Sequence, residues 1–279
     1  MKLCNIQVGG AVHLGLVTER GVVDATAAGC PLCMDQVIAG ADRTALAALA
    51  ADESLPLVVR PCYADVVNRP GKLLCVGLNY RAHAQNAGFA LPEHPVLFSK
   101  FANALAPSGA AVELPDWEES YDYEAELVIV MGKTAWNVSE AEAMDCVFGY
   151  TCGNDLSCRA PQMRSGQWLI GKTMPGFGPC GPCIVTADAF DPQADNPVRS
   201  YVNGEPRQNG LTSDMIFSVA QVISYASRYI RLEPGDLIFT GTPSGVALEG
   251  GQSKYSWLKS GDRVDVEIQG IGTLQNTLC

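Results

Sequence analysis

The sequence has no long hydrophobic run. None of its 279 residues belongs to a stretch approaching the roughly 18 consecutive apolar residues that a membrane-spanning helix needs. The first residues, Met1 to Ala11, also lack the basic start and the long apolar stretch of a secretory signal peptide. We therefore expect an unexported, cytoplasmic protein that does not bind a membrane.

Basic residues are scarce. The chain has 19 Lys and Arg against 30 Asp and Glu, which gives a formal net charge of −11. A surplus of negative charge repels the phosphate backbone of nucleic acids and argues against a nucleic-acid-binding protein. Hydrophobic residues make up 47% of the chain and charged residues only 18%, so we expect a globular protein that buries a sizeable core rather than a disordered one.

Cysteine, by contrast, is abundant. The 11 cysteines are odd in number and widely spread, which fits reduced thiols better than a disulfide scaffold. Two Cys-x-x-Cys pairs, Cys30 with Cys33 and Cys180 with Cys183, could form a four-thiolate zinc site, and the second also has the spacing of a thioredoxin-like redox motif. Because the second pair lies in a Gly/Pro-rich segment and does not open a helix, we expect small buried residues in turns.

The first 70 residues predict a small α+β domain. Short segments alternate between apolar and polar residues over 4–8, 13–18 and 21–24, and an Ala-rich helical stretch follows around residues 42–51. The dipeptide Pro70-Gly71 then stops local structure before a buried strand at 73–78. We place the domain boundary there, with domains over residues 1–70 and 71–279.

The larger domain predicts many strands and few helices. Asn203-Gly204 predicts a two-residue hairpin turn, because both residue types tolerate a positive φ. An apolar stripe predicts one clear helix over residues 214–230, with Thr212 or Ser213 as its N-cap. This pattern favours a mixed β-sandwich or rolled β-barrel. The predicted strands cover residues 73–78, 95–98, 125–131, 184–186, 199–202, 236–240 and 263–268.

An acidic segment runs directly into one of these strands. Residues 116–126 hold six carboxylates in eleven positions. Because strand side chains alternate between faces, Glu124 and Glu126 point the same way. Two carboxylates on one face repel each other and lose solvation, a cost that a bound divalent cation removes. By itself, the same segment also fits a solvated acidic edge.

Other polar residues occur where chemistry is possible. Asp155 follows a glycine-rich approach that suits either a site or a local Asx-turn. Lys172 is a lone cation in an apolar segment, either a snorkelling surface residue or, beside a metal, a group that stabilises an enolate. His83 is one of only three histidines and by itself fits a structural role. Thr240 and Thr242 lie where a strand passes into a loop. Their hydroxyls could face a ligand there, but a plain turn explains the segment equally well.

Taken in order, several segments resemble the fumarylacetoacetate hydrolase superfamily over roughly residues 70 to 279. Each segment alone is weak, but their joint order and spacing is specific. The resemblance implies the α+β fold class, with a mixed β-roll or β-barrel-like catalytic domain behind the small N-terminal domain, and a homodimer. The segments are 76–83, 122–127, 149–150, 154–155 with Arg159, 171–172, 181–182, 203–205 and 235–245.

The resemblance also implies a Mg²⁺ or Mn²⁺ centre. By position, its ligands are Glu124, Glu126 and Asp155, an all-oxygen set that favours Mg²⁺, Mn²⁺ or Ca²⁺ over zinc without choosing among them. The resemblance further implies that Lys172 approaches the bound 2-oxo acid and that His83 is catalytic. It also implies that Arg159, Gln162 and Thr242 face the substrate.

Family members cleave C–C bonds in 1,3-dioxo acids, so we expect a metal-dependent hydrolase of a small 2,4-dioxo (acylpyruvate-like) or related 2-oxo acid. Many members carry a Glu three residues after the His of the lid segment, but Asn86 stands there in this chain. Asn cannot accept a proton at neutral pH. Either His83 acts alone, Glu93 replaces the acid, or the reaction needs no such base. Ala160 also replaces an acid often seen after the Arg.

Two alternatives stay open at this point. A decarboxylase or keto–enol isomerase would use the same metal site without activating water, and Asn86 favours that chemistry. A non-catalytic ligand-binding or thiol-redox protein would depend on Cys180 and Cys183 instead. The joint presence of three carboxylates and Lys172 counts against this last alternative.

Overall fold

A ten-stranded mixed sheet forms the centre of the protein. The computed structural model describes residues 1–250 and 255–279. Neighbouring strands are antiparallel except for β15 beside β4 and β12 beside β6, which run parallel. In spatial order the strands are β3 (Gly21–Asp24), β2 (Ala11–Thr18), β1 (Lys2–Val8), β12 (Gly178–Thr186), β10 (Val147–Asn154), β9 (Ala125–Met131), β15 (Leu237–Phe239), β4 (Leu73–Gly77) and β5 (Val96–Lys100), with β6 (Leu105–Pro107) also on β12.

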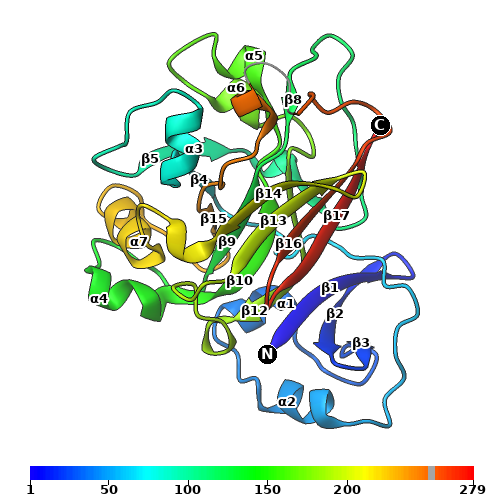
Figure 1. Ribbon diagram of the computed structural model, residues 1–279. Coiled ribbons are helices and arrows are strands. Elements are labelled where there is room, and N and C mark those ends of the chain that lie inside the picture. The colour runs from blue at the N-terminus through cyan, green and yellow to red at the C-terminus, as the bar shows by residue number, and fades with distance from the viewer. Residues whose placement is uncertain (251–254) are drawn as a thin grey trace.

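A second, five-stranded sheet packs on the first (Figure 1). Its β17 contacts β12 and its β16 contacts β10, and the alternating buried residues of β13 and β16 face the shared core. This arrangement of packed sheets confirms the predicted β-rich α+β fold. The strands, in order, are β14 (Glu205–Leu211), β13 (Pro197–Val202), β16 (Arg263–Ile268), β17 (Gly272–Leu278) and β7 (Ala111–Val112), and β8 (Tyr121–Asp122) pairs separately with β11 (Ser157–Cys158).

The helices are short, the longest being α7 with 9 residues. None of the described helices is long and apolar enough to cross a membrane. Helices α4 and α7 contact each other, as do α5 and α6. The α-helices are α1 (Met34–Ile38), α2 (Thr44–Ala51), α3 (Arg81–Asn86), α4 (Glu140–Ala143), α5 (Arg159–Gln162), α6 (Leu169–Lys172) and α7 (Val219–Ser227), and the 3₁₀ helices are η1 (Ala102–Ala104), η2 (Met144–Cys146), η3 (Ala187–Ala189), η4 (Thr212–Asp214) and η5 (Ala247–Gly250).

The N-terminal segment continues the large sheet. Strand β1 pairs with β12, with Leu3 opposite Ile184, and Leu3 shares one hydrophobic cluster with Met34, Val128 and Ile184. The first three strands and two helices lie beside the rest of the protein (blue in Figure 1). The division of the chain at residue 70 stays a prediction.

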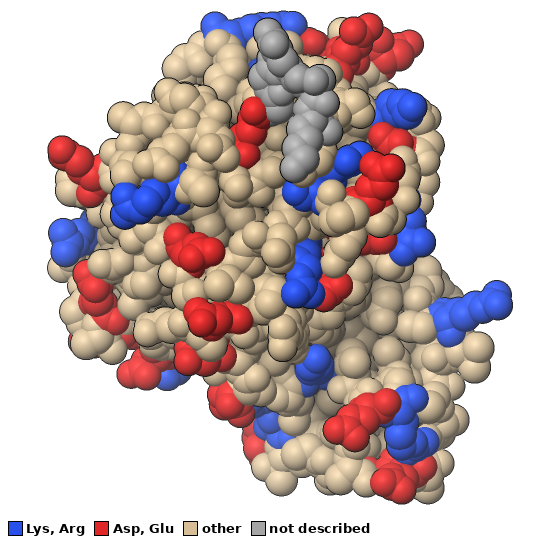
Figure 2. Space-filling view, in the orientation of Figure 1, with Lys and Arg blue, Asp and Glu red and all other residues tan. Residues whose placement is uncertain are grey.

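The surface carries both signs of charge. On the face shown in Figure 2, acidic and basic side chains are interspersed and do not form one continuous field of either sign.

The Asn203-Gly204 turn joins β13 to β14, as predicted. Asn203 has φ 53° and Gly204 has φ 81°, the positive values that the two central positions of a type I′ turn need. The strands on either side then pair antiparallel, with a shift in register between Ser200 and Tyr201.

The helix predicted over 214–230 is wrong at both ends, because α7 begins late and already stops at Ser227. Helix α7 begins at Val219, and the residues before it bind to Asn79 instead of continuing a helix. The N–H of Ile216 donates to the Asn79 carbonyl at 2.7 Å, and the N–H of Phe217 donates to Asn79 Oδ1 at 2.8 Å. This long-range contact fixes residues 216–217 and overrides the local apolar pattern.

The cap of α7 is also not the predicted one. Ser218, rather than Thr212 or Ser213, is the N-cap. Its Oγ accepts from the Gln221 N–H at 3.3 Å, and Gln221 Oε1 accepts from the Ser218 N–H at 2.9 Å. This reciprocal capping box is readable as Ser-x-x-Gln in the sequence.

The second cysteine pair does not lie in a turn, so that expectation is wrong. Cys180 and Cys183 are both buried within strand β12. Burial raises the pKa of Cys183 to about 11 and that of Cys180 well above its ordinary value. All cysteines are free, and the described part of the chain brings no thiol into a group of possible metal ligands. The geometry therefore does not favour the zinc and thiol-redox alternatives.

Replacing Ser218 with Ala is expected to lower the free energy of unfolding by about 1 kcal/mol, because the Gln221 N–H loses its acceptor. Chemical denaturation measures the change. Ser213→Ala is the matched control, because Ser213 is exposed and its hydroxyl donates to Asp195 rather than capping α7. An equal loss in both variants would contradict the cap.

Alkylation of the folded protein is expected to label only Cys33, Cys62 and Cys279, the three exposed thiols. Buried thiols with raised pKa values form little thiolate at neutral pH and react slowly. Mass spectrometry of peptides from native and denatured protein measures the labelling. Rapid labelling of Cys180 or Cys183 in the native protein would restore the thiol-redox alternative.

Candidate active site

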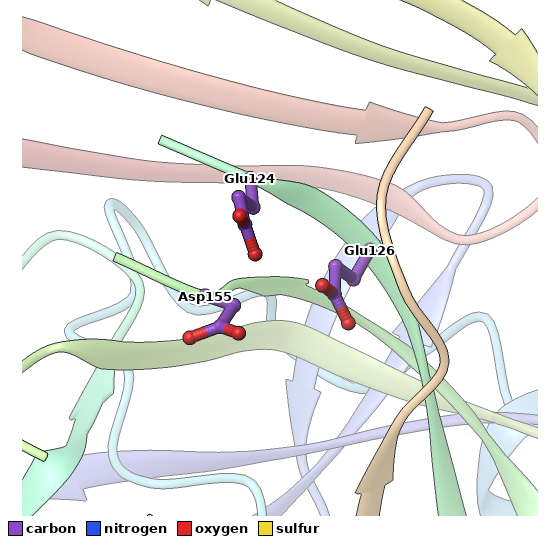
Figure 3. Close-up of side chains that lie close together, drawn as sticks. All are labelled: Glu124, Glu126 and Asp155. Carbon is purple, nitrogen blue, oxygen red and sulfur yellow. The ribbon is translucent and has the colours of Figure 1, made fainter. Parts of the chain in front are cut away.

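Three carboxylates converge where strands β9 and β10 pair. Glu124 precedes β9, Glu126 lies within it, and Asp155 directly follows β10. The Asp155 N–H donates to the Glu124 carbonyl at 3.0 Å, and the Glu124 N–H donates to Asn154 Oδ1 at 3.0 Å. One oxygen from each carboxylate lies within 4.8 Å of the others. Figure 3 shows the three side chains turned toward a common space.

These carboxylates are buried. Glu124 is 5% exposed, Glu126 2% and Asp155 0%. The solvated acidic edge that the sequence also allowed is thereby excluded for this part of the acidic segment. Buried carboxylates need compensating charge, because removal from water is costly for an ion.

Lys172 supplies part of that charge from α6. Its Nζ lies 2.8 Å from Glu124 Oε2 and 2.7 Å from Asp155 Oδ2, and the side chain is 2% exposed. The interpretation of Lys172 as a snorkelling surface residue is therefore wrong. Burial alone would lower the pKa of Lys172, but the Asp155 and Glu124 carboxylates outweigh it and raise the pKa. Lys172 thus remains an ammonium, and its third N–H makes no hydrogen bond with the described residues.

A glycine lets α6 approach closely enough to place Lys172. A Cβ at Gly171 would come within 2.5 Å of the Cys158 carbonyl and of Gln162 Cβ. The helices α5 and α6 therefore pack in this way only with glycine at position 171.

Arg159 binds the acidic segment from α5. Its guanidinium donates to Glu124 Oε1 at 2.6 Å, to Asp122 Oδ2 at 2.8 Å and to Gln162 Oε1 at 3.0 Å. Burial raises the pKa of Glu124, but Lys172 and Arg159 outweigh it, so that pKa is lowered. Because a guanidinium only donates, Gln162 must turn its oxygen toward Arg159, and its amide nitrogen is left for another partner.

Lys100 is a site residue that the sequence reasoning missed. Its Nζ donates to the carbonyls of Leu156 at 3.1 Å and Phe177 at 2.7 Å, and also to the carbonyl of Lys172. The same ammonium lies 2.5 Å from Asp155 Oδ1. This ion pair lies wholly out of contact with solvent, since both side chains are fully buried. In the sequence, the only local indication of this role is that the lysine ends an apolar strand.

The charges of this cluster do not balance. Four buried carboxylates meet three cations, so one negative charge is left over. Glu126 bears it most directly: its side chain accepts one hydrogen bond, from the Gly241 N–H at 2.8 Å, and burial together with Asp155 and Glu124 raises its pKa well above the ordinary value. The charged groups are Asp122, Glu124, Glu126 and Asp155 with Lys100, Arg159 and Lys172.

A divalent cation fits this arrangement. It would offset the surplus negative charge, which Glu126 bears with a single hydrogen bond to its side chain. The ligand atoms are all oxygens, which suits Mg²⁺ or Mn²⁺. The three predicted ligands therefore form a group that can hold a divalent metal.

A pocket of about 390 Å³, counted up to its open mouth, lies over the acidic cluster. All the predicted site residues line it except Asp155, which forms an ion pair with Lys172. Thr242 lines it too, but its hydroxyl already donates to the Ala125 carbonyl at 2.9 Å and accepts from Gln208 at 2.7 Å. Apolar walls come from Phe98 and Trp168.

His83 lines the same pocket from α3, and it has an acidic partner that was not predicted. Its Nδ1 lies 2.5 Å from Glu249 Oε1. Glu93, the residue considered from the sequence, is exposed and does not line the pocket. Glu249 is 166 residues from His83 along the chain, so no local pattern could have linked the two.

The chain is similar over most of its length to several known proteins. Human oxaloacetate tautomerase FAHD2A, a mitochondrial protein, is 36% identical over 95% of this chain and 86% of its own length. The 2,4-didehydro-3-deoxy-L-rhamnonate hydrolase of Sphingomonas is 38% identical over 98% of this chain and 94% of its own.

Solved structures of similar proteins also superpose on the whole chain. A fumarylacetoacetate hydrolase from Exiguobacterium antarcticum superposes with a TM-score of 0.87 at 34% identity, covering 100% of this chain and 99% of its own. A maleylpyruvate hydrolase from Sphingobium, solved with manganese(II) and pyruvate, superposes with a TM-score of 0.81 at 29% identity, covering 100% and 98%.

The family model for the C-terminal part of fumarylacetoacetate hydrolase matches residues 72–279, which include every charged residue of the acidic cluster described above. The chain therefore belongs to the fumarylacetoacetate hydrolase family.

Proposed function

We propose that this protein is a divalent-metal-dependent enzyme that interconverts the keto and enol forms of a small 2-oxo acid such as oxaloacetate. The observation that carries the proposal is that an unpaired Lys172 N–H and His83 line one pocket above the buried triad of Glu124, Glu126 and Asp155. A base that carries a proton between carbon and oxygen, together with a donor to the enolate oxygen, is what keto–enol interconversion requires. The human relative named oxaloacetate tautomerase supports this choice.

The triad would hold Mg²⁺ or Mn²⁺, and such an ion, when bound, polarises a 2-oxo group and stabilises negative charge developing on its oxygen. The manganese(II) in the Sphingobium relative supports a divalent metal of this kind. Ca²⁺ has the same preference for oxygen ligands.

Three side chains around the pocket have further roles in the proposed reaction. The amide nitrogen of Gln162, left over from its bond to Arg159, can donate to a substrate carboxylate. Lys172 donates its third N–H to the enolate oxygen. His83 takes the proton from the carbon next to the 2-oxo group and returns it to that oxygen, so the reaction is an isomerisation without oxidation.

Hydrolysis of a C–C bond in a 2,4-dioxo acid is the second candidate. The His83–Glu249 pair favours it, because a histidine with a carboxylate partner can also take a proton from water. The relative named as a rhamnonate-derived acid hydrolase supports it as well. In both reactions, negative charge develops on the enolate oxygen. The homodimer stays a proposal that rests on the resemblance, and the cytoplasmic location stays a proposal that rests on the pattern of the sequence.

Metal-loaded enzyme is expected to accelerate the keto–enol interconversion of oxaloacetate, followed by ultraviolet absorbance of the enol, and to release no pyruvate. Chelation, or Glu126→Gln, should slow it by at least ~100-fold, because several kcal/mol of charge stabilisation are lost. An acylpyruvate is assayed in parallel. Cleavage of the acylpyruvate into two acids, with no effect on oxaloacetate, would replace the first candidate by the second.

Metal binding should be visible without any substrate. Mn²⁺ at about 100 times its dissociation constant is expected to stabilise the wild type by ~2.7 kcal/mol, measured by thermal unfolding. Glu126→Gln should abolish this shift. The same variant should raise the stability of the metal-free protein by ~1–3 kcal/mol, because a buried carboxylate with a raised pKa destabilises the fold at neutral pH.

Glu124→Gln is the matched control, since it also removes one buried carboxylate. Here the metal-free protein should lose stability, because Lys172 and Arg159 are left with less countercharge. Equal effects of the two variants on the metal-free protein would contradict the charge imbalance assigned to Glu126.

A further inference from the structure

One side of the pocket is built from aromatic rings. Phe98 and Trp168 pack edge to face, with 5.3 Å between ring centroids and 69° between ring planes. Trp168 lies against the backbone of Gly77, because a Cβ at position 77 would come within 2.4 Å of Trp168 Cζ3. The indole therefore occupies the space that any side chain at position 77 would need. All three residues line the pocket, and we call Gly77, Phe98 and Trp168 the aromatic wall.

The aromatic wall lies beside the ammonium that faces the substrate. Lys172 Nζ is 5.1 Å from the centroid of the Phe98 ring, and two of its three protons go to Glu124 and Asp155. A substrate oxygen that accepts the third proton lies about 3 Å from this nitrogen. The carbon that exchanges its proton, C3 of a 2-oxo acid, is two bonds away from that oxygen. A substituent on C3 can therefore contact the Phe98 ring.

Three further apolar side chains line the pocket. They are Phe89, which follows α3, Met163, which ends α5, and Leu248 in η5. Met163 is 44% exposed, and Phe89 and Leu248 are half-buried. An apolar group that enters between them removes their surface from water, and this burial is favourable.

Positive charge is confined to the acidic end of the pocket. Among the described residues that line it, only Arg159 and Lys172 carry a fixed positive charge at neutral pH. Both bind carboxylates of the acidic cluster. The apolar side chains provide no partner for a second carboxylate of a substrate. Moving a carboxylate out of water without a partner is costly.

The charge count points the same way. The acidic cluster has one surplus negative charge, which a divalent cation would turn into one surplus positive charge. One substrate carboxylate then brings the total to zero. A second carboxylate would make the total negative again, and Glu249, which lies beside His83, adds to that negative charge. The pocket thus compensates the charge of one carboxylate and offers apolar surface to the rest of the substrate.

We propose that the pocket takes 2-oxo acids with a single carboxylate and an apolar, above all aromatic, group on C3, and that the aromatic wall and Met163 set this preference. This inference rests on the proposed function and narrows its substrate class. Oxaloacetate carries a carboxylate on C3, and phenylpyruvate carries a phenyl ring on the same carbon. In both acids the reaction moves a C3 proton to the 2-oxo oxygen. Oxaloacetate remains a substrate, but it binds more weakly than phenylpyruvate.

The first test compares the binding of these two acids to the Mg²⁺-loaded wild type by isothermal titration calorimetry. Each acid is first brought to keto–enol equilibrium, so that tautomerisation gives no net heat. We expect a Kd for phenylpyruvate at least tenfold lower than that for oxaloacetate, because the ring buries apolar surface and the second carboxylate loses water without a partner. A smaller ratio, a reversed ratio, or no binding of either acid would overturn the proposal.

The second test removes part of the aromatic wall. Trp168→Ala is expected to raise the Kd of phenylpyruvate roughly tenfold and to leave the Kd of oxaloacetate within about threefold, because apolar contact is lost and no charge changes. Stabilisation by Mn²⁺ should stay unchanged, because Trp168 is not among the three carboxylates that can hold the metal. An equal change for both acids in a variant that still binds Mn²⁺ would contradict the role of the wall.

The third test adds a positive charge on the apolar side. Met163 is partly exposed, so Met163→Arg can keep its charged end near water. We expect the ratio of the two Kd values to shift at least tenfold in favour of oxaloacetate. Met163→Gln is the matched control, since it is polar but uncharged, and should shift the ratio less than threefold. Equal shifts in the two variants would contradict the charge argument.

The two proposals fail differently. If the wild type binds phenylpyruvate more tightly than oxaloacetate but accelerates the tautomerisation of neither, the selectivity stands and the proposed function fails. If the wild type accelerates the tautomerisation of oxaloacetate and binds it at least as tightly as phenylpyruvate, the selectivity fails alone. If Trp168→Ala does not fold, the wild-type comparison and the Met163 variants still decide the proposal.

Discussion

The buried charge cluster is the constraint on which the site and much of the fold depend. Lys172 bonds to Glu124 at the start of β9 and to Asp155 at the end of β10, so one ammonium joins a helix to both strands. Each partner then needs a countercharge of its own, which explains why Arg159 reaches the same carboxylate. A cluster of this kind tolerates the loss of few members, because each loss leaves another charge buried without a partner.

Main-chain groups complete this cluster. Lys100 gives all its protons to carbonyls of three separate segments, at residues 156, 172 and 177, and the Gly241 N–H serves Glu126. The site therefore depends on where the backbone runs as well as on which side chains are present. This dependence is a physical reason why the order and spacing of short segments identified the family better than any single residue.

Periodicity and composition predicted what is local. The strand at 125–131 and its alternation were sufficient to place Glu124 and Glu126 on one side, and the Asn203-Gly204 turn followed from its two residue types. The missing parts are all contacts between distant segments: Asn79 with the start of α7, Lys100 with three carbonyls, and Glu249 with His83. No window of sequence contains both members of such a pair. The roles of the predicted site residues remain predictions until the variants are measured.

The pairing of β1 with β12 has a consequence for the catalytic part of the chain. Strand β12 lies directly beside β10, whose end positions Asp155, and β1 covers the other edge of β12 at Ile184 and Val185. Without the N-terminal strands, the described sheet would expose that stretch of backbone N–H and C=O groups beside apolar side chains. Such an edge is a template for pairing with another chain and for aggregation. The N-terminal segment thus protects the sheet that carries the site, although it contributes no group to the acidic cluster.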